Sequence, residues 1–479
     1  MIITAYLVLM LGIGVWAKKY IKTIDDYLLA GRRLGLVLAT ATLAATHYGG
    51  GFVLGGASWG VKYGIGGFWY GAACGLGLAL LAITFAKLAR LLAVYTVPEL
   101  LYMRYRSKVV QLIAASLSLL ALIGITGAQI VACGALFEAM GLDWAWGATL
   151  SAIIFITYTA LSGLWAVALT DLAQIIIGSL GVVIATLLVL QRAGGLAGVA
   201  SRLGNMYSTG VLEKPPSSYL DIASPGLPMI MLTLMATIMY TLIGQDFYQR
   251  LFAAKDEKTA IRASLISGIF LIALSFLPPI AGMAALAISN DPLSLANSPR
   301  TAVPKLILTV FGPVMGGLFM AAVLAAIMST ADSLLLAATS HVVRDFYYGL
   351  NKQVVGKEMV KLSIVITIVI GSFSLIAAFI VRGIIELLIY SYDLYTSGCF
   401  MPLVVGLLWK RASREGALAG MVAGIAMSMV NILGLTQIEM YELVYVRSAL
   451  VSLIAMIAVS LLTKPTQPEE RLTEILKWT

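Results

Sequence analysis

Long apolar segments follow one another along almost the whole chain, separated by short polar connections. Most have about 20 residues, the length that an α-helix needs to cross a bilayer. They lack the strict alternation of membrane-spanning β-strands, so helices are predicted rather than a barrel. About thirteen spans, numbered from zero, are predicted at residues 2–17, 37–58, 66–86, 109–138, 146–162, 166–191, 227–250, 263–288, 303–343, 360–381, 384–409, 415–434 and 445–463.

The composition agrees with an all-α polytopic membrane protein. Of the 479 residues, 60% are hydrophobic and 11% are charged, whereas soluble domains have about 25% charged residues. No segment has the length and polarity of a soluble domain, so residues 1–479 are predicted to form a single transmembrane domain. The first apolar segment has no cleavage site of small residues and is predicted to remain as a span. The three cysteines lie in apolar spans and indicate neither disulfides nor a metal site.

Basic residues predict the orientation of the chain. The net charge of +9 does not indicate nucleic-acid binding, because the positive charges gather in alternate short loops. One set of loops contains Lys18, Lys19, Lys22, Arg32, Arg33, Lys87, Arg90, Arg104, Arg106, Arg250, Lys255, Lys258, Arg262, Arg344, Lys352, Lys357, Lys361, Lys410, Arg411 and Arg414. The opposite loops contain only Lys62, Arg192, Arg202, Lys214, Arg300 and Arg382. The positive-inside rule therefore predicts a multi-pass protein of the plasma (inner) membrane with its N-terminus outside and its C-terminus in the cytoplasm.

One apolar span contains hydroxyls and a carboxylate, between Leu324 and Ser333. An ionisable residue inside the bilayer costs about 2.5–3.5 kcal/mol, so it usually faces a cavity, a partner or an ion path. With Asp332 at its edge, one helical face carries Ala326, Ser329, Thr330 and Ser333. Oxygen ligands with at most one full charge suit a small, hard, monovalent cation. Alternatively, the hydroxyls bond to their own helix and Asp332 bonds to a neighbour.

Three consecutive glycines, Gly49 to Gly51, interrupt span 1. Each costs about 1 kcal/mol in a helix interior, and freed backbone groups at membrane depth are tolerated only in cavities or inside protein. A break here would free the carbonyls of Ala45 and Tyr48 as ligands, with His47 beside the opening. Alternatively, the small residues serve close helix packing.

Span 6 has a comparable weak point at Gly244, five spans later. Two interrupted spans at matching positions are a pointer to a transporter built from inverted repeats. The spacing predicts a first repeat at 37–191 (spans 1–5) and a second at 227–409 (spans 6–10), with broken spans 1 and 6. The halves show no residue-level similarity, so the prediction depends on spacing alone. Asp246 and Arg250, one turn apart, are predicted to pair with each other.

Four motifs, in the same order, resemble signatures of the sodium:solute symporter family. They are Asp25-Asp26-Tyr27-Leu28-Leu29-Ala30-Gly31-Arg32, the segment from Tyr158 to Gln174, Ala325-Ala326-Ile327-Met328-Ser329-Thr330, and Trp409-Lys410-Arg411 followed by Gly416-Ala417-Leu418-Ala419-Gly420. The resemblance runs from the first span to about span 11. It implies a LeuT-type fold whose core consists of two inverted five-helix repeats.

The resemblance also implies sodium as the coupling ion, with one or two ions bound. The main site is expected at the carbonyls of Ala45, Tyr48 and Ala326 and the hydroxyls of Ser329 and Thr330. A second sodium site, present in some members, is expected at Asp171, Ser329, Asp332 and Ser333. The alternative for Asp171 is an N-cap of span 5.

The sequence constrains the identity of the substrate less than that of the coupling ion. The chain is nearest in look to the high-affinity choline transporter branch, through Gly49-Gly50-Gly51, Met328 to Ser333, Phe247-Tyr248-Gln249-Arg250 and Tyr390 to Leu394. It lacks that branch's aromatic cage, which a quaternary amine requires. His47 beside a helix break can bind a carboxylate, so an amino acid or a small carboxylate is favoured. The expected substrate-binding residues are His47, Tyr48, Gly50, Thr126, Thr241, Gly244 and Gln245.

The sequence therefore predicts a secondary active symporter that imports a small polar solute with sodium by alternating access, embedded in the lipid bilayer and functional as a monomer. The main alternative is proton coupling, with Asp171, Asp332 or His47 as the carrier. A membrane sensor is disfavoured, because only about 17 residues follow Leu462 and sensors need an output domain. No nucleophile–base pair, histidine ligand pair or phosphate loop indicates an enzyme.

Overall fold

The structure is a computed structural model, which describes residues 1–297, 304, 307, 308, 311–348, 357–381, 384–433 and 444–477. Helices account for the regular structure of these residues, and an isolated β-bridge joins Leu34 to Ala254. The predicted loop residues Arg300, Lys352 and Arg382 and most of 303–310 lie outside the described residues. The prediction of an all-α protein is confirmed for the described part of the chain.

The helices of the first half begin with α1 and end with the long α9. Their bounds are α1 Ile2–Ala17, α2 Ile24–Leu29, α3 Leu36–His47, α4 Gly56–Tyr63, α5 Phe68–Thr84, α6 Ala86–Leu92, α7 Val97–Tyr105, α8 Lys108–Ala139 and α9 Trp144–Arg192. A π-helical stretch, η3 Gly51–Gly55, leads into α4.

The second half begins with short helices outside the long bundle. The bounds are α10 Gly195–Ser208, α11 Pro216–Tyr219, α12 Leu227–Ile243, α13 Gln245–Ala253, α14 Glu257–Leu274, α15 Leu277–Ile288, α16 Pro292–Asn297, α18 Pro313–Ser340, α19 Lys357–Ile380, α20 Ile384–Leu408, α21 Arg414–Ile432, α22 Val444–Leu462 and α23 Glu470–Leu476. A second π-helical stretch, η6 His341–Tyr348, continues α18.

The described residues contain eight helical segments long and apolar enough to cross a membrane. The pair α12 and α13, bent by 43° at the intervening residue, brings the number to nine if it is one span. The chain is therefore an integral membrane protein. The expected count of thirteen spans remains a prediction, since several interrupted or shorter helices do not meet this criterion alone.

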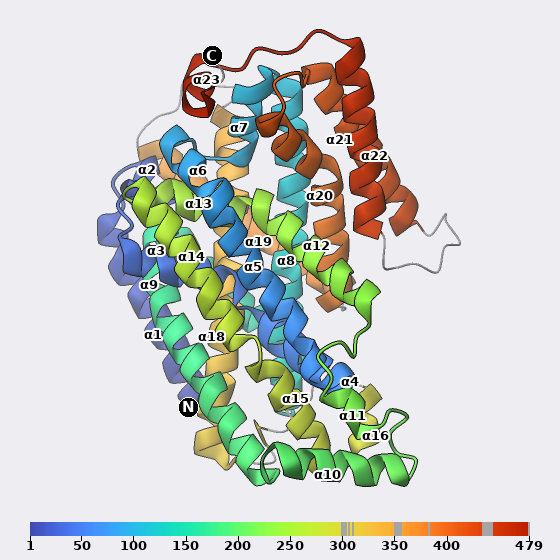
Figure 1. The fold of residues 1–479 in the computed structure, drawn as a ribbon. Helices are drawn as coiled ribbons and strands as arrows, with labels where there is room; N and C mark the ends of the chain where they lie inside the picture. The colour runs from blue at the N-terminus through green and yellow to red at the C-terminus, as the bar shows by residue number, and fades with distance from the viewer. Residues whose placement is uncertain are drawn as a thin grey trace.

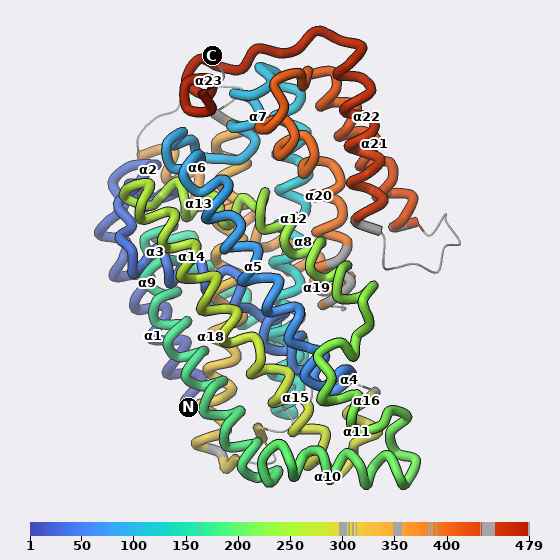
Figure 2. The backbone as a smooth tube through the Cα atoms, in the orientation of Figure 1, coloured from blue at the N-terminus to red at the C-terminus, as the bar shows by residue number. Residues whose placement is uncertain are grey.

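The long helices run between two ends of the molecule (Figure 1). The short helices α2, α7 and α23 lie at the end that also holds the C-terminus, and α10, α11 and α16 lie at the opposite end (Figure 2). Helix α18 is the most enclosed of the apolar spans, since 78% of its apolar window is buried against 28% for α1. It packs against α3, α8 and α9, so its polar residues face protein and not lipid.

The predicted spans 146–162 and 166–191 correspond to two helical segments of α9, Trp144–Leu161 and Gly163–Arg192, which meet at a kink at Gly163. Gly163 has a φ of 53°, and a Cβ there would lie 2.2 Å from the carbonyl oxygen of Tyr27, so only glycine fits. Asp171 lies well inside this helix rather than at a helix start. The N-cap alternative for Asp171 is therefore wrong.

Candidate functional site: a helix break and an aromatic cavity

The regular hydrogen bonding of α3 ends with the Tyr48 amide, which donates to the Ala44 carbonyl at 3.0 Å. Tyr48 has φ −79° and ψ 60°, outside the helical region. The Gly49 amide donates to the His47 carbonyl at 2.9 Å instead of reaching back four residues to Ala45. The carbonyl of Ala45 is therefore released from the helix ladder and is available to other groups.

The polar face of α18 lies against this released carbonyl. The Thr330 hydroxyl lies 3.0 Å from the Ala45 carbonyl oxygen, and the Ser329 hydroxyl lies 3.4 Å from it. Ser329 also donates to the Ala326 carbonyl of its own helix at 2.9 Å. A Cβ on Gly49 would lie 2.3 Å from Thr330 Oγ1, so the two segments approach as closely as glycine permits.

The five residues expected at the main sodium site thus lie on two facing segments. Ser329 and Thr330 are almost fully buried, and the backbone of Tyr48 forms the break itself. The side chain of Tyr48 points elsewhere, since its hydroxyl donates to the Gly178 carbonyl of α9 at 3.4 Å. Any role of Tyr48 in binding a cation is therefore limited to its backbone.

A second polar group lies between α3, α9 and α18. Asp332 accepts the hydroxyl of Tyr158 at 2.7 Å, and Asp171 accepts the hydroxyl of Thr42 at 2.5 Å. Ser333 lies 3.3 Å from the Thr46 hydroxyl. The second oxygen of each carboxylate, Asp171 Oδ1 and Asp332 Oδ1, is buried without a hydrogen-bond partner. Buried polar atoms of this kind are rare in proteins and call for an explanation.

Arg250 of α13 reaches toward the same group and is fully buried. Its Nη1 donates to the backbone carbonyl of Asp246 at 2.9 Å and to Gln249 Oε1 at 3.1 Å, and its Nε lies 3.3 Å from the Thr42 hydroxyl. Its Nη2 has no hydrogen-bond partner. The predicted side-chain pairing of Asp246 with Arg250 is wrong, because the guanidinium bonds the backbone instead of the carboxylate.

A cavity of about 20 Å³ lies beside the break, which is about the space that one water molecule needs. Among its lining residues are Thr46, His47, Gly49, Gly51 and Thr330 of the two facing segments. The opposite walls come from α5, α8, α12, α13 and α20, through Tyr70, Gln129, Tyr240, Asp246, Phe247 and Tyr392.

Only some of the expected substrate residues line this cavity. His47 does, and it lies 2.9 Å from the Thr241 hydroxyl while its ring lies against Phe247 at 4.3 Å between centroids. The amide of Gly50 donates to Gln129 Oε1 at 2.9 Å. Thr126 bonds to Leu122 of its own helix.

The sequence did not single out the aromatic side chains of the cavity. Tyr240 and Phe247 flank the interruption at Gly244, three or four residues to either side, and this proximity was the available signal. Tyr70 comes from α5, and no local pattern marked it. Tyr392 of α20 lies in the segment Tyr390 to Leu394, which resembles the choline transporter branch, but it was not among the expected substrate-binding residues.

A model of the sodium:solute symporter family matches residues 27–424. The chain belongs to this family. The resemblance inferred from the four motifs is thereby confirmed. This chain is 30% identical to the sodium/pantothenate symporter of Escherichia coli (strain K12), and the match covers 88% of each chain. It is 26% identical to an osmoregulated proline transporter of Bacillus subtilis (strain 168), over 98% of this chain and 96% of that protein.

Solved structures share its fold. A Na⁺-coupled sialic acid symporter, in a substrate-bound outward-open state, matches with a TM-score of 0.82 at 23% identity over 98% of each chain. The nucleobase-cation-symport-1 family transporter Mhp1 matches with a TM-score of 0.60 at 14% identity, over 94% of this chain and 98% of that one. The fold of this family member is therefore LeuT-like.

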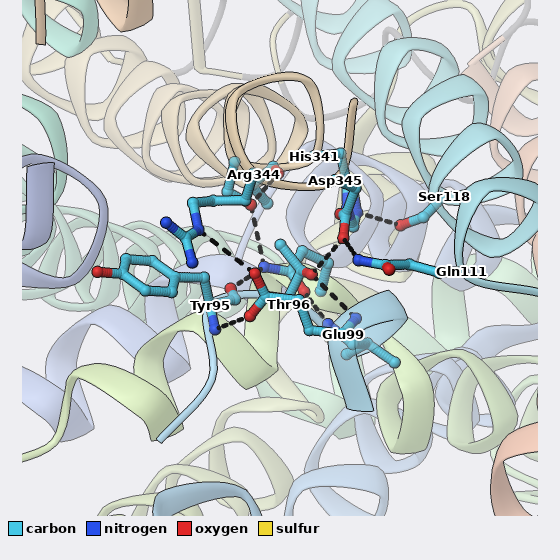
Figure 3. Close-up of polar contacts among 12 residues, drawn as sticks. Tyr95, Thr96, Glu99, Gln111, Ser118, His341, Arg344 and Asp345 are labelled. Carbon is cyan, nitrogen blue, oxygen red and sulfur yellow. Dashed lines mark hydrogen bonds and ion pairs between the residues drawn. The ribbon is translucent and has the colours of Figure 1, made fainter. Parts of the chain in front are cut away.

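At the end that holds α7, a polar network joins α7, α8 and η6 (Figure 3). Asp345 accepts from Thr96 and from Gln111, both at 2.8 Å. His341 Nδ1 lies 2.9 Å from Asp345 Oδ2, and His341 Nε2 lies 2.8 Å from the Ser118 hydroxyl. All five side chains are buried, so the network fixes the relative positions of these three elements.

Gln245 connects this network to the interrupted span, although it was expected in the substrate site. Its Oε1 accepts the amide of Val97 at 2.8 Å, and its Nε2 donates to the carbonyl of Tyr95 and the hydroxyl of Ser340 at 2.9 and 3.0 Å. Nearby, Arg344 pairs with Glu99 at 3.3 Å (Figure 3). The start of α13 is thus held to α7 and α18.

Proposed function

We propose that this protein is a sodium-coupled secondary active symporter that imports a small polar organic solute by alternating access. An amino acid or a small carboxylate is the favoured solute. The observation that supports sodium coupling most directly is the released Ala45 carbonyl facing the hydroxyls of Ser329 and Thr330. A neutral set of oxygens from two different spans suits a monovalent hard cation. A cation bound there would join α3 to α18.

The proposed architecture has about thirteen spans, with repeats at 37–191 and 227–409 and with breaks in spans 1 and 6. The 43° bend between α12 and α13 and the loss of helical geometry at Tyr48 support it. The proposed orientation, in the plasma (inner) membrane, places the N-terminus outside and the α7 end in the cytoplasm. The proposed transporting unit is the monomer.

We further propose one or two sodium ions. The candidate second site lies at Asp171, Asp332 and Ser333, with Ser329 one turn away. The buried oxygens of the two carboxylates that lack hydrogen-bond partners support it. Arg250 already places one positive charge beside this group, so a second ion would bind here only if both carboxylates are ionised.

The coupling energy is sufficient for uptake. One charge crossing 100 mV gains about 2.3 kcal/mol, and a tenfold sodium gradient adds about 1.4 kcal/mol. The sum, about 3.7 kcal/mol, supports several-hundred-fold accumulation per sodium ion. Two sodium ions would double the exponent.

In alternating access, the network that holds Gln245 would keep the cytoplasmic end closed while the central cavity is loaded from outside. Sodium between α3 and α18 stabilises that outward-facing arrangement and orders span 1 for the solute. Opening inward then requires that α13 leave α7 and α18, which breaks the three hydrogen bonds of Gln245.

The test is uptake by purified protein in liposomes. Labelled amino acids, monocarboxylates, choline and sugars are offered under a sodium gradient and then under a proton gradient of equal size. Sodium-driven uptake that is lost in Thr330→Ala supports the proposal. Uptake that ignores sodium and follows protons overturns it and favours the proton-coupled alternative, for which the buried Asp171, Asp332 and His47 are the candidate carriers.

A further inference from the structure

The cavity beside the helix break has aromatic walls. The rings of Tyr240 and Tyr392 stack at 4.4 Å between centroids with an interplanar angle of 27°. The ring of Phe247 stands edge-on to Tyr240 at 6.0 Å and 81°. Tyr70 approaches from α5, since a Cβ on Gly51 would lie 2.8 Å from its hydroxyl oxygen. Aromatic faces attract cations through their quadrupole, most strongly where water is excluded.

One carboxylate, that of Asp246, lies among the described residues that line this cavity. Asp246 is only 1% exposed, and its Oδ1 accepts the hydroxyl of Tyr240 at 3.1 Å. None of the ion pairs in the described part of the chain includes it. Arg250, one turn along α13, gives its Nη1 to the Asp246 backbone and to Gln249. The negative charge of Asp246 is therefore not paired by direct contact.

A buried carboxylate that no positive group contacts directly is costly. The nearby charge of Arg250 offsets part of that cost, and a positive group bound in the cavity would offset more of it. A cation that enters the cavity meets the carboxylate of Asp246 and the aromatic side chains of Tyr240 and Tyr392, which line the same cavity. The same carboxylate repels an anionic solute that carries no positive group. The cavity therefore discriminates by charge as well as by shape.

We propose that the transported solute carries a cationic nitrogen, which Asp246 and the rings of Tyr240, Phe247 and Tyr392 hold in this cavity. This inference specifies the solute of the proposed symport, and it rests on that proposal because the cavity is taken to be the solute-binding site. It narrows the solute to ammonium compounds and zwitterions such as amino acids, and it excludes carboxylates that contain no cationic nitrogen. The present volume of about 20 Å³ means that the walls must separate before any such solute enters.

The experiment compares pairs of compounds that differ only at the nitrogen. L-alanine is paired with L-lactate, choline with its tert-butyl carbon analogue, and glycine betaine with the corresponding tert-butyl carboxylate. Binding to the full chain in detergent is measured as the rise in unfolding temperature at saturating sodium. At least one nitrogen-bearing member is expected to raise it, and its nitrogen-free partner is expected to be without effect.

The matched variants are Asp246→Asn and Asp393→Asn. Both remove a buried carboxylate while keeping its shape, but Asp393 lies on α20 outside the cavity, where Ser397 and Ser428 donate to it. Asp246→Asn is expected to weaken the nitrogen-bearing ligand at least about tenfold, and Asp393→Asn is expected to leave its affinity unchanged. Sodium alone should still stabilise both variants.

Three results overturn the inference: equal binding of a nitrogen-free partner, unchanged affinity in Asp246→Asn, or no response to any nitrogen-bearing probe. The sodium measurement separates this inference from the proposed symport. If sodium has no effect on the unmodified protein while a nitrogen-bearing probe binds through Asp246, the symport proposal fails and the cationic site stands. If sodium stabilises the protein but only nitrogen-free compounds bind, the symport proposal survives and the cationic site fails.

Discussion

The hydroxyl of Thr330 provides the sharpest test of the proposed sodium site. It lies 3.0 Å from the released carbonyl of Ala45, whereas the Ser329 hydroxyl lies 3.4 Å away and also serves the Ala326 carbonyl of its own helix. Interactions of a polar group with a charged partner contribute about 1.5–3 kcal/mol. Because 1.4 kcal/mol is a factor of ten in affinity, Thr330→Ala should weaken sodium binding about 10- to 100-fold.

The assay is the half-saturating sodium concentration for thermal stabilisation of the purified protein, which needs no knowledge of the solute. Thr330→Ser keeps the hydroxyl and should stay within about threefold of the unmodified protein, since the difference amounts to less than about 1 kcal/mol. Ser329→Ala should have a smaller effect than Thr330→Ala, because the Ser329 hydroxyl is shared with its own helix.

Thr339→Ala is the matched control on the same helix. Thr339 is fully buried and bonds to Leu335 and Thr367, so its loss should lower the unfolding temperature without changing the half-saturating sodium concentration. If Thr330→Ala leaves that concentration unchanged, or if Thr339→Ala shifts it equally, the sodium site does not lie where we place it.

Three further changes test the surroundings of the site. Gly49→Ala places a methyl group 2.3 Å from Thr330 Oγ1 and should abolish the stabilisation by sodium in the same assay. Gly55→Ala, whose methyl group would have no neighbour nearer than 4.0 Å, should leave that stabilisation intact. Equal effects of the two substitutions would refute the close approach. Gln245→Leu breaks three hydrogen bonds, each worth about 1 kcal/mol, so hydrogen–deuterium exchange of α7 should accelerate; unchanged exchange would show that Gln245 does not hold that end closed. Burial raises the pKa of the Glu99 carboxyl, so a fall in pH neutralises it earlier than an exposed glutamate and breaks its ion pair with Arg344. Mild acidification should therefore accelerate hydrogen–deuterium exchange of α7 in the unmodified protein, and it should cause no further acceleration in Glu99→Gln.

Much of the candidate cation site was accessible to sequence reasoning because its parts are local. A carboxylate and hydroxyls inside an apolar run, as at Ser329 and Asp332, conflict with a lipid environment. Three consecutive glycines conflict with an uninterrupted helix. Such conflicts can be recognised without knowing which residues lie nearby in space. In the fold, the glycine segment and the polar segment of α18 contact each other.

The cavity was less accessible because its walls come from helices far apart along the chain. Tyr70 is an ordinary aromatic residue of an apolar span, and Tyr392 lies in a motif to which no position in the site could be assigned, until α5 and α20 place both around the break. Gln245 was expected in the substrate site and instead bonds to α7 and α18, since its position beside Gly244 does not reveal which way the side chain points. The same is true of Arg250, whose expected partner was one turn away and whose actual contacts include Thr42 of α3.

The sequence by itself determined the class of protein, its family, the approximate spans and the two segments that conflict with a continuous lipid-facing helix. These properties follow from hydropathy and backbone propensity, which act over a few neighbouring residues. Only the tertiary structure decided which groups meet: the Ala45 carbonyl with Thr330, the Asp246 carboxylate with Tyr240, and Gln245 with α7. Such contacts depend on how helices pack against one another, and packing joins residues that no local pattern relates.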